Sequence, residues 1–260
     1  MSEMPTLFVS HGAPTLIITP GKAREFLSEL GGQIPKPSSI LTVSAHWETG
    51  TPSVSKAGTP ETIYDFYGFP RELYAIRYPA QGAPALAARV AGLLESAGFE
   101  ASQDAQRGLD HGAWVPMALM YPDADIPVTQ LSIQTHLGAE HHYRVGQALR
   151  PLRSEGVLIL ASGGATHNLR EFGRFQYESE PPAWVTEFRQ WLAERTEAGA
   201  VEDLVHYRER APHAVRNHPT EDHFVPFFAA LGAGSPQPKA KRIHTSTTFG
   251  ILAMDSYRFD

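Results

Sequence analysis

The chain has 260 residues, of which 42% are hydrophobic and 19% charged, with no cysteine and a formal net charge of −6. This length suits one α/β domain, and the apolar fraction supplies a sizeable core and argues against disorder. The missing cysteines exclude thiol catalysis and thiolate metal ligands, and the scattered Lys and Arg exclude a basic stripe of the kind that grips nucleic acid.

The N-terminal stretch MSEMPTLFVSHG has no basic region and only a short apolar run, so no secretory signal is expected. No apolar stretch approaches the ~20 residues that a membrane helix needs. A cysteine-free chain also suits a reducing compartment. We therefore expect a cytoplasmic protein without a membrane partner; the sequence carries no indication of its oligomeric state.

Short apolar runs along the chain predict strands. Continuous β-branched and leucine residues with little alternation are typical of strands covered on both faces. The expected strands are Thr6–Ser10, Ser39–Ser44, Val128–Ile133 and Val157–Ala161, with a final pair around Lys241–Thr247 and Gly250–Asp255 after a loop at Gly234–Pro238.

Helical patterns lie between these strands. Apolar residues at helical spacing, with glycines closing some of the segments, predict helices. The expected helices are Gly21–Leu30, Pro84–Ala97, His141–Arg153 and Ala183–Thr196. Strands and helices alternate without a linker or repeat, so we predict a single α/β domain over residues 1–260, with a mainly parallel central sheet and helices on both faces.

Twelve histidines are the compositional anomaly, and histidine is the commonest metal ligand and a frequent acid/base. His11, His46 and His167 each follow a predicted strand within a few residues. Ligands of open α/β sheets bind at the carboxyl ends of the strands. Three imidazoles at one such rim predict a metal site or an acid/base cluster. The alternative is that each is an ordinary loop histidine.

The neighbours of these histidines suggest supporting roles. Glu48 is expected to orient the imidazole of His46 as a hydrogen-bond partner, and Trp47 to shield the site or to belong to the core. Gly163 and Gly164, which precede His167, permit close approach of the backbone to a ligand or simply form a turn.

His111 follows Asp110, which is expected to cap a helix carrying Trp114 to Tyr121. As a functional residue, His111 would hydrogen-bond to substrate. Without such a role it would be a surface histidine.

The segment HPTEDH contains several possible ligands, namely His218, Glu221, Asp222 and His223. Thr220 followed by two acids also predicts a helix start, in which case His223 would lie one turn inside that helix. The other histidines, namely His136, His141, His142, His206, His213 and His244, are expected to be surface or structural residues.

Neither an HExxH zinc-protease motif nor a GxGxxG, Walker or GxSxG motif occurs. A bound metal is therefore the expected carrier of the chemistry.

Eight motifs, taken together and in order, resemble the bacterial and plant DOPA extradiol dioxygenases within the class III ring-opening dioxygenases. They are SHGAP, SAHWE, IYDFYGFP, YAIRYP, DHGAW, YPDADIP, GGATHNL and HPTEDHFVP. The resemblance covers nearly the whole chain.

The resemblance implies one divalent metal held by His11, His46 and His223. It implies that His167 is the acid/base, with a further ligand as the alternative role, and that His111 binds substrate or dioxygen intermediates. Many class III relatives use a glutamate as third ligand, whereas a histidine stands here. Fe(II) is expected in the active enzyme, with Zn(II) as the alternative in purified protein because it stands above iron in the Irving–Williams order.

The reaction implied is ring opening of a DOPA-like catechol by O₂ to a semialdehyde, with both as small-molecule partners. Gly163 and Gly164 would make room for the ring. An aromatic wall of Tyr64, Phe66, Tyr67 and Phe69 is a further expectation, with ordinary core packing as its alternative. The competing hypotheses are a zinc hydrolase that activates water at the same histidines, a closed structural metal site and, least supported, a nucleotide-binding module.

Overall fold

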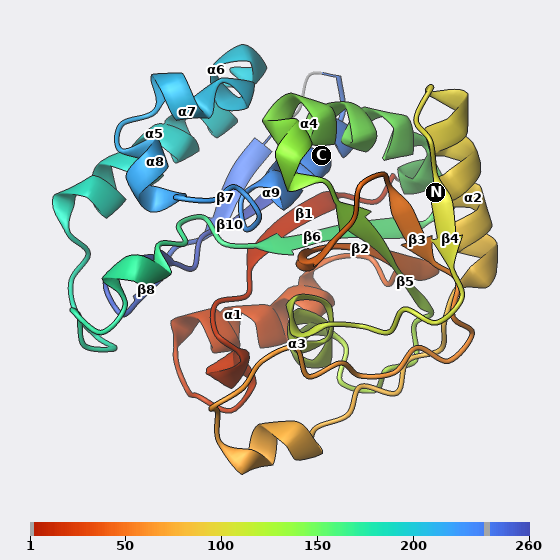
Figure 1. Cartoon of the computed structure of the whole chain (residues 1–260), viewed down its shortest axis with the longest axis horizontal. Coiled ribbons are helices and arrows are strands. Elements are labelled where there is room, and N and C mark those ends of the chain that lie inside the picture. The colour runs from red at the N-terminus through yellow and green to blue at the C-terminus, as the bar shows by residue number, and fades with distance from the viewer. Residues whose placement is uncertain (1–2, 237–239) are drawn as a thin grey trace.

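The structure is a computed structural model that describes residues 3–236 and 240–260 (Figure 1). Part of the loop expected at Gly234–Pro238 and the first two residues of the N-terminal stretch lie outside the described residues. None of the helices in the described ranges is both long and apolar enough to cross a membrane.

A mixed eight-stranded sheet in the order β4-β3-β5-β2-β6-β1-β10-β7 forms the centre of the molecule. The strands are β1 Thr6–Ser10, β2 Ser39–Glu48, β3 Ser53–Ser55, β4 Ser102–Asp104, β5 Val128–Ile133, β6 Val157–Gly163, β7 Ala240–His244 and β10 Ser256–Phe259. The four central strands β5, β2, β6 and β1 run parallel, while β10 and β3 pair antiparallel with β1 and β5. The prediction of a mainly parallel central sheet is confirmed.

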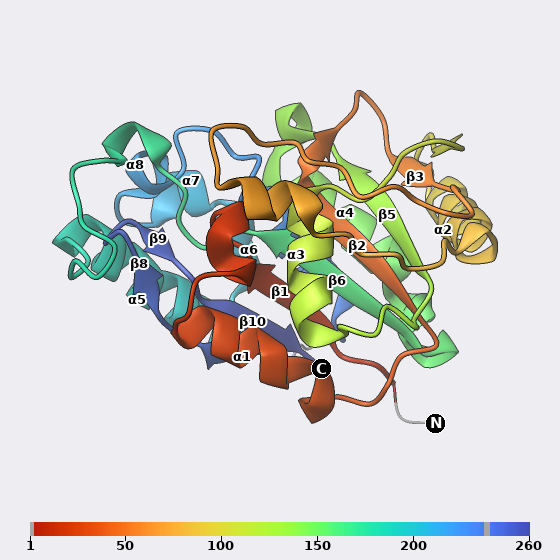
Figure 2. The same cartoon turned by 90° about the horizontal axis from the view of Figure 1, so that it is seen from below.

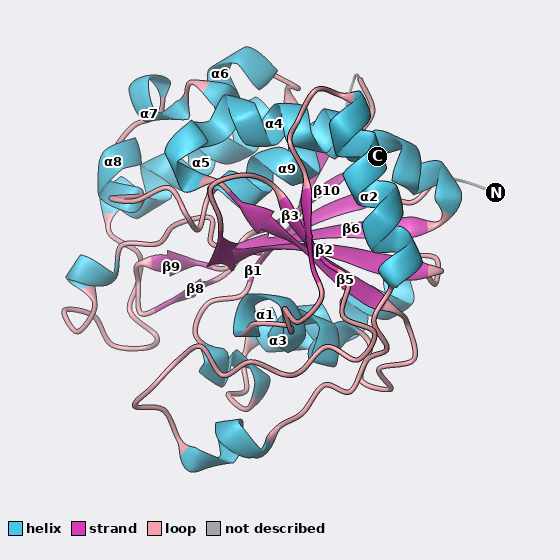
Figure 3. Ribbon diagram, turned by 45° about the vertical axis from the view of Figure 1, so that its right-hand side comes forward, coloured by secondary structure: helices cyan, strands magenta, loops and turns pink. Residues whose placement is uncertain are grey.

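Helices cover both faces of this sheet, as expected. They are α1 Lys22–Leu30, α2 Pro84–Ser96, α3 His111–Met120, α4 Gly138–Leu149, α5 Ala183–Glu197, α6 Val201–Val205, α7 Tyr207–Arg210, α8 Ala214–Asn217 and α9 Val225–Ala233. Figure 3 shows the sheet between α4 and α9 on one side and α1 and α3 on the other, and Figure 2 shows α1 and α3 in front of the strands. The molecule is a single three-layered α/β domain.

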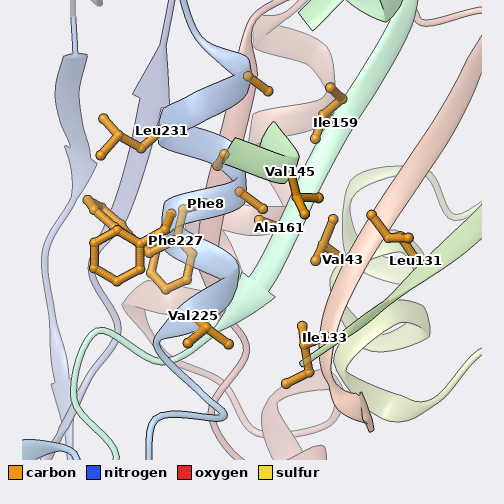
Figure 4. Close-up of a cluster of buried hydrophobic side chains, with 14 of the residues drawn as sticks. Phe8, Val43, Leu131, Ile133, Val145, Ile159, Ala161, Val225, Phe227 and Leu231 are labelled. Carbon is orange, nitrogen blue, oxygen red and sulfur yellow. The ribbon is translucent and has the colours of Figure 1, made fainter. Parts of the chain in front are cut away.

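Successive side chains of the central strands point to opposite faces of the sheet, and this divides the core into two clusters. On β1, Phe8 belongs to the cluster under α4 and α9, whereas Leu7 and Val9 belong to the cluster under α1 and α3. On β6, Ile159 and Leu160 divide in the same way. Figure 4 shows the first cluster. Because both faces are buried, the central strands are apolar at almost every position, which is the pattern that made them predictable.

Several boundaries differ from the sequence-based expectation. β2 continues to Glu48, so His46 lies within the strand rather than after it. The last sheet strand is Ser256–Phe259, whereas residues 247–253 form the small hairpin of β8 Thr247–Thr248 and β9 Leu252–Ala253. β3 and β4 were missed because each has only three residues and their sequences, SVS and SQD, carry little apolar signal.

The helix start predicted at Thr220 is wrong. α9 begins at Val225, after Phe224. Pro226 suits the first turn because a proline there sacrifices no intrahelical hydrogen bond. Glu221 instead accepts the backbone N–H groups of Phe224 and Val225, which closes a turn before the helix. His223 therefore precedes the helix instead of lying inside it.

Candidate metal centre

His11 and His46 meet at the carboxyl ends of β1 and β2, the two parallel strands that flank β6. His11 follows β1, and its N–H donates to Gly163 O at 3.0 Å, which extends the β1–β6 ladder. β2 is irregular between Val43 and Glu48, and this irregularity includes His46. Irregular strand positions of this kind often redirect side chains beside active sites. The Nε2 atoms of His11 and His46 lie 3.0 Å apart.

His223 reaches this pair from the segment before α9. Its ring lies 5.4 Å from that of His11 and 4.8 Å from that of His46, measured between centroids. Ligand atoms of the three histidines all lie within 4.8 Å of one another. The structure thus brings together the three residues that the family resemblance implied as ligands.

The glycines at the end of β6 admit the His223 segment. The N–H of Gly164 donates to His223 O at 2.8 Å, and a Cβ on Gly163 would lie 2.1 Å from that oxygen. Any larger residue at position 163 would push the segment away. The side-chain direction of Gly163, expected to leave room for a substrate ring, is therefore filled by the His223 backbone.

Each of the three imidazoles has an oxygen near Nδ1. Nδ1 of His11 lies 2.9 Å from Ser162 Oγ, that of His46 lies 3.4 Å from Asp65 Oδ2, and that of His223 hydrogen-bonds to the Asp222 carboxylate. The two carboxylates can only accept and therefore favour the Nδ1–H tautomer of His46 and His223, while the Ser162 hydroxyl is able to accept Nδ1–H of His11; this tautomer leaves the Nε2 lone pair free. The three Nε2 atoms are thus prepared to bind a metal.

Burial keeps these imidazoles neutral. Burial, followed by the neighbouring imidazoles, holds the pKa of His11 and that of His223 well below the ordinary value. Burial and His111 lower the pKa of His46 to about 4, although Asp110 and Asp65 act in the opposite direction. Neutral imidazole is the form that binds a metal.

The geometry fits a single divalent cation. Two ligand nitrogens about 2.1 Å from one metal and roughly 90° apart lie about 3 Å from each other. The 3.0 Å between Nε2 of His11 and Nε2 of His46 matches that separation. Two lone pairs at this distance repel one another unless a cation or a proton lies between them.

His167 stacks on His223 and stands apart from the other two ligand candidates. The ring centroids are 3.4 Å apart and the planes are inclined by 8°. Its ligand atom groups with Asp222 and His223 rather than with His11 and His46. Burial lowers the pKa of His167 to about 4 against the opposing charge of Asp222. A neutral imidazole beside the cluster suits proton transfer.

His111 is the first residue of α3, and its ring lies 4.0 Å from that of His46. It is buried, unlike the surface histidine of the alternative expectation. Asp65 accepts its backbone N–H and its Nδ1–H, each at 2.9 Å. Burial would raise the pKa of Asp65, but the hydrogen bonds and charge of His111 prevail and lower it to about 2.

The start of α3 is tied to the strand that carries His46. Asp110 caps the helix through the Ala113 N–H at 3.2 Å, as predicted, and its buried carboxylate also accepts Ser44 Oγ at 2.6 Å and an Arg107 N–H at 2.7 Å. A Cβ on Gly112 would lie 2.4 Å from Ser44 Oγ and 2.9 Å from His46 Cδ2. Only glycine allows this close approach.

The expected partner of His46 and the expected aromatic wall differ in part from what the structure shows. Glu48 is exposed, and the carboxylate beside His46 belongs to Asp65. Phe66 is buried with its ring edge-on to His111 at 5.7 Å, whereas Tyr67 is 92% exposed. Tyr64 and Phe69 pack beside the core cluster under α1 and α3.

His218 lies outside the cluster of ligand candidates. Its Nε2–H donates to Ala165 O at 3.0 Å, and its ring stacks on Phe224. The sequence did not indicate Asp65, and it indicated Asp222 only as a possible ligand or as an acid in the first turn of a helix. An acid among aromatic residues (IYDFYGFP) and an acid directly before a histidine were the available signals.

An open α/β sheet with buried histidines gathered at the carboxyl ends of its parallel strands defines a metal-binding enzyme. The family model described as the catalytic LigB subunit of aromatic ring-opening dioxygenase matches residues 5–259, and the chain belongs to this family.

Similar proteins agree with this membership. The chain is 46% identical to a protein of Beta vulgaris named 4,5-DOPA dioxygenase extradiol, over 98% of this chain and 96% of that one. A protein of the same name from Escherichia coli K12 is 40% identical over 91% and 87% of the two chains. The crystal structure of an uncharacterized protein from Escherichia coli K12 superposes with a TM-score of 0.83 at 34% identity, covering 99% of this chain and 100% of the other.

The chain is thus an extradiol ring-cleaving dioxygenase. Neither the zinc hydrolase nor the nucleotide-binding module is favoured by this membership.

Proposed function

We propose that this enzyme opens the ring of a DOPA-like catechol with O₂, using one Fe(II) ion held by His11, His46 and His223. The relatives named 4,5-DOPA dioxygenase extradiol support the substrate class. The observation that supports the site assignment is the convergence of three imidazoles, each with an oxygen near Nδ1 and with ligand atoms all within 4.8 Å of one another.

The reaction decides between iron and zinc. Neutral imidazoles bind either ion, and the Irving–Williams order favours zinc. Zinc has no redox chemistry, whereas ring opening transfers electrons from the catechol to O₂. Bound Fe(II) supplies Lewis acidity toward the catechol hydroxyls and a route for those electrons. Fe(II) is therefore the metal of the active enzyme.

His167 is the acid/base in this proposal. Its pKa of about 4 leaves its imidazole neutral at pH 7, so that it accepts a proton from a catechol hydroxyl and returns it later in the cycle. Stacking on His223 fixes the plane of the ring. Its backbone N–H donates to Asn217 O at 3.0 Å, which anchors the residue to the segment that leads to His223.

His111 supplies a second imidazole beside His46, for substrate or oxygen. Phe66 packs against His111 and limits the access of water from that side. A Cβ on Gly164 would lie 3.6 Å from His167 Cβ, so we assign Gly164, rather than Gly163, to the substrate side of the site.

The test is anaerobic reconstitution with Fe(II), followed by addition of L-DOPA and air. Oxygen uptake and visible absorbance are recorded together, and we expect one O₂ consumed per catechol with a yellow product. Protein loaded with Zn(II) and a 1,3-diol analogue of the substrate are the matched controls, and neither should consume oxygen.

Simple catechol and protocatechuate complete the panel. Turnover of these compounds but not of L-DOPA would contradict the DOPA-like substrate. Equal turnover by the Zn(II) protein would contradict the assignment of Fe(II).

A further inference from the structure

Asp65 binds His111 at two points and also lies close to His46. Its Oδ1 accepts the His111 backbone N–H at 2.9 Å, and its Oδ2 accepts Nδ1–H of the same residue at 2.9 Å. The same Oδ2 lies 3.4 Å from His46 Nδ1. The Asp65 side chain is only 21% exposed, and that of His111 only 6%.

A carboxylate in this position dictates the tautomer of the ring. An ionised carboxylate has no donor, so the proton between Asp65 and His111 must stand on Nδ1. The backbone N–H bound to Oδ1 prevents the carboxylate from rotating away. In neutral His111 the remaining nitrogen, Nε2, is therefore an acceptor.

The neighbouring residue closes the other side of the ring. Phe66 follows Asp65 in the chain and meets His111 edge-on, with an interplanar angle of 90°. The ring of His111 lies 4.0 Å from His46 and 5.2 Å from His11. The segment Asp65–Phe66 thus fixes both the orientation and the protonation pattern of an imidazole beside the ligand cluster.

We propose that Asp65 is a positioning residue that fixes His111 in the Nδ1–H form, so that Nε2 serves as the hydrogen-bond acceptor beside the metal site. This proposal rests on the proposed function for its kinetic consequence only. Asp65 acts through His111 and needs no contact with substrate.

Asp65→Asn gives a specific test. With Oδ1 still accepting the backbone N–H, the new NH₂ group faces Nδ1 of His111 and can only donate to it. The proton then moves to Nε2. A change of tautomer by this substitution is known to disable catalytic histidines while leaving the geometry intact.

The first measurement is long-range ¹H–¹⁵N NMR of the histidine rings in the Zn(II) protein, with His111→Gln identifying the signals of His111. We expect Nδ1–H in the wild type and Nε2–H in Asp65→Asn, with zinc content unchanged in both. This measurement needs no turnover, so its result is independent of whether the enzyme shows dioxygenase activity.

The second measurement is steady-state kinetics of the Fe(II) protein. Loss of a supporting partner costs roughly 10- to 100-fold, and we expect this loss in kcat, with KM changed by less than about 3-fold. Asp123→Asn makes the same chemical change at an exposed carboxylate and should leave kcat unchanged.

The same tautomer in wild type and Asp65→Asn, or an unchanged kcat, would overturn the proposal. Loss of zinc from Asp65→Asn would overturn it too, since Asp65 would then act through His46. If Asp65→Asn does not fold, Asp65→Ala replaces it, and retention of a pure Nδ1–H form there would equally contradict the assignment.

Discussion

Two groups of histidines in this molecule differ in how their ring nitrogens are used. The first, which we call the strand-end cluster, consists of His11, His46, His111, His167 and His223. The second, the α4 pair, consists of His141 and His142. In the α4 pair, Nδ1 of His142 donates to Gly138 O at 2.7 Å and Nε2 accepts the Gln134 N–H at 3.1 Å. Nε2 of His141 lies 3.1 Å from Gln134 Oε1.

The two groups differ in whether Nε2 of the ring is already used in a hydrogen bond to Gln134. Both ring nitrogens of His142 form hydrogen bonds with backbone groups, and these bonds connect the end of β5 to α4. In the strand-end cluster the Nδ1 atoms of His11, His46 and His223 have oxygens beside them, and Nε2 of His11 lies 3.0 Å from Nε2 of His46. Burial alone does not separate the two groups, because His142 is as buried as His11. The hydrogen-bond partners of each ring are what separate the two groups.

The largest effect is expected from removing a ligand. His46→Ala should lose the metal and all oxygen uptake above that of the metal-free protein, because two imidazoles remain where three converge. Metal analysis of the purified variant measures this. His142→Gln is the matched control and should keep full metal content. Full metal occupancy in His46→Ala would contradict the assignment of the strand-end cluster as the metal site.

His167→Ala should keep its metal but lose roughly 10²- to 10⁴-fold in kcat, the usual contribution of a general acid/base. The expectation follows from the grouping of its ring with Asp222 and His223 rather than with His11 and His46. Metal content and oxygen uptake are measured on the same sample. Metal loss in this variant would make His167 a ligand.

Asp222→Asn should weaken metal binding by roughly 10- to 100-fold, because the Asp222 carboxylate orients His223 and raises its basicity. A competition titration with a chelator measures the affinity. Asp123→Asn, at an exposed position, is the control. An unchanged affinity in Asp222→Asn would show that backbone contacts alone place His223.

The smallest effect concerns stability and pH in the α4 pair. Burial lowers the pKa of His142 to about 3, with the Gly138 hydrogen bond opposing, whereas the unfolded chain takes up that proton near pH 6.5. The stability that His142 contributes is therefore present above pH 6.5 and is lost as the pH falls toward 3, by at most about 1.4 kcal/mol per pH unit.

Urea unfolding of the metal-free protein between pH 7.5 and 5 measures this loss. The free energy of unfolding should fall less steeply in His142→Gln than in the wild type. Parallel curves for the two proteins would contradict the assignment of the slope to His142.

The sequence predicted the strand-end cluster only as far as the sheet determines it. His11 and His167 follow parallel strands and His46 lies near the end of another, and parallel strands bring their carboxyl ends to one edge, so their proximity could be inferred from apolar runs alone. His223 lies in a turn between α8 and α9 that reaches the site through backbone contacts at Gly163 and Gly164. The hydrophobic pattern of a sequence does not reveal such a contact, and only the family resemblance indicated His223.

Asp65 lay beyond prediction for a related reason. It stands in an irregular segment between β3 and the short helix Arg71–Ala75, where side-chain direction follows no period. Glu48 is close to His46 in sequence, but it is exposed at the end of β2, and the carboxylate beside His46 Nδ1 belongs to Asp65. Sequence proximity was the wrong criterion for a hydrogen-bond partner.

The late position of His223 in the chain also bears on how the protein is made. During synthesis, His11 and His46 emerge early, whereas His223 follows after most of the sheet has been translated. A metal that binds all three joins the first strand to a segment near the end of the chain, and it adds to the stability of the folded state by mass action. The turn before α9 should then exchange its amide hydrogens faster when the metal is removed, because the metal would tie this late segment to the first two strands of the sheet.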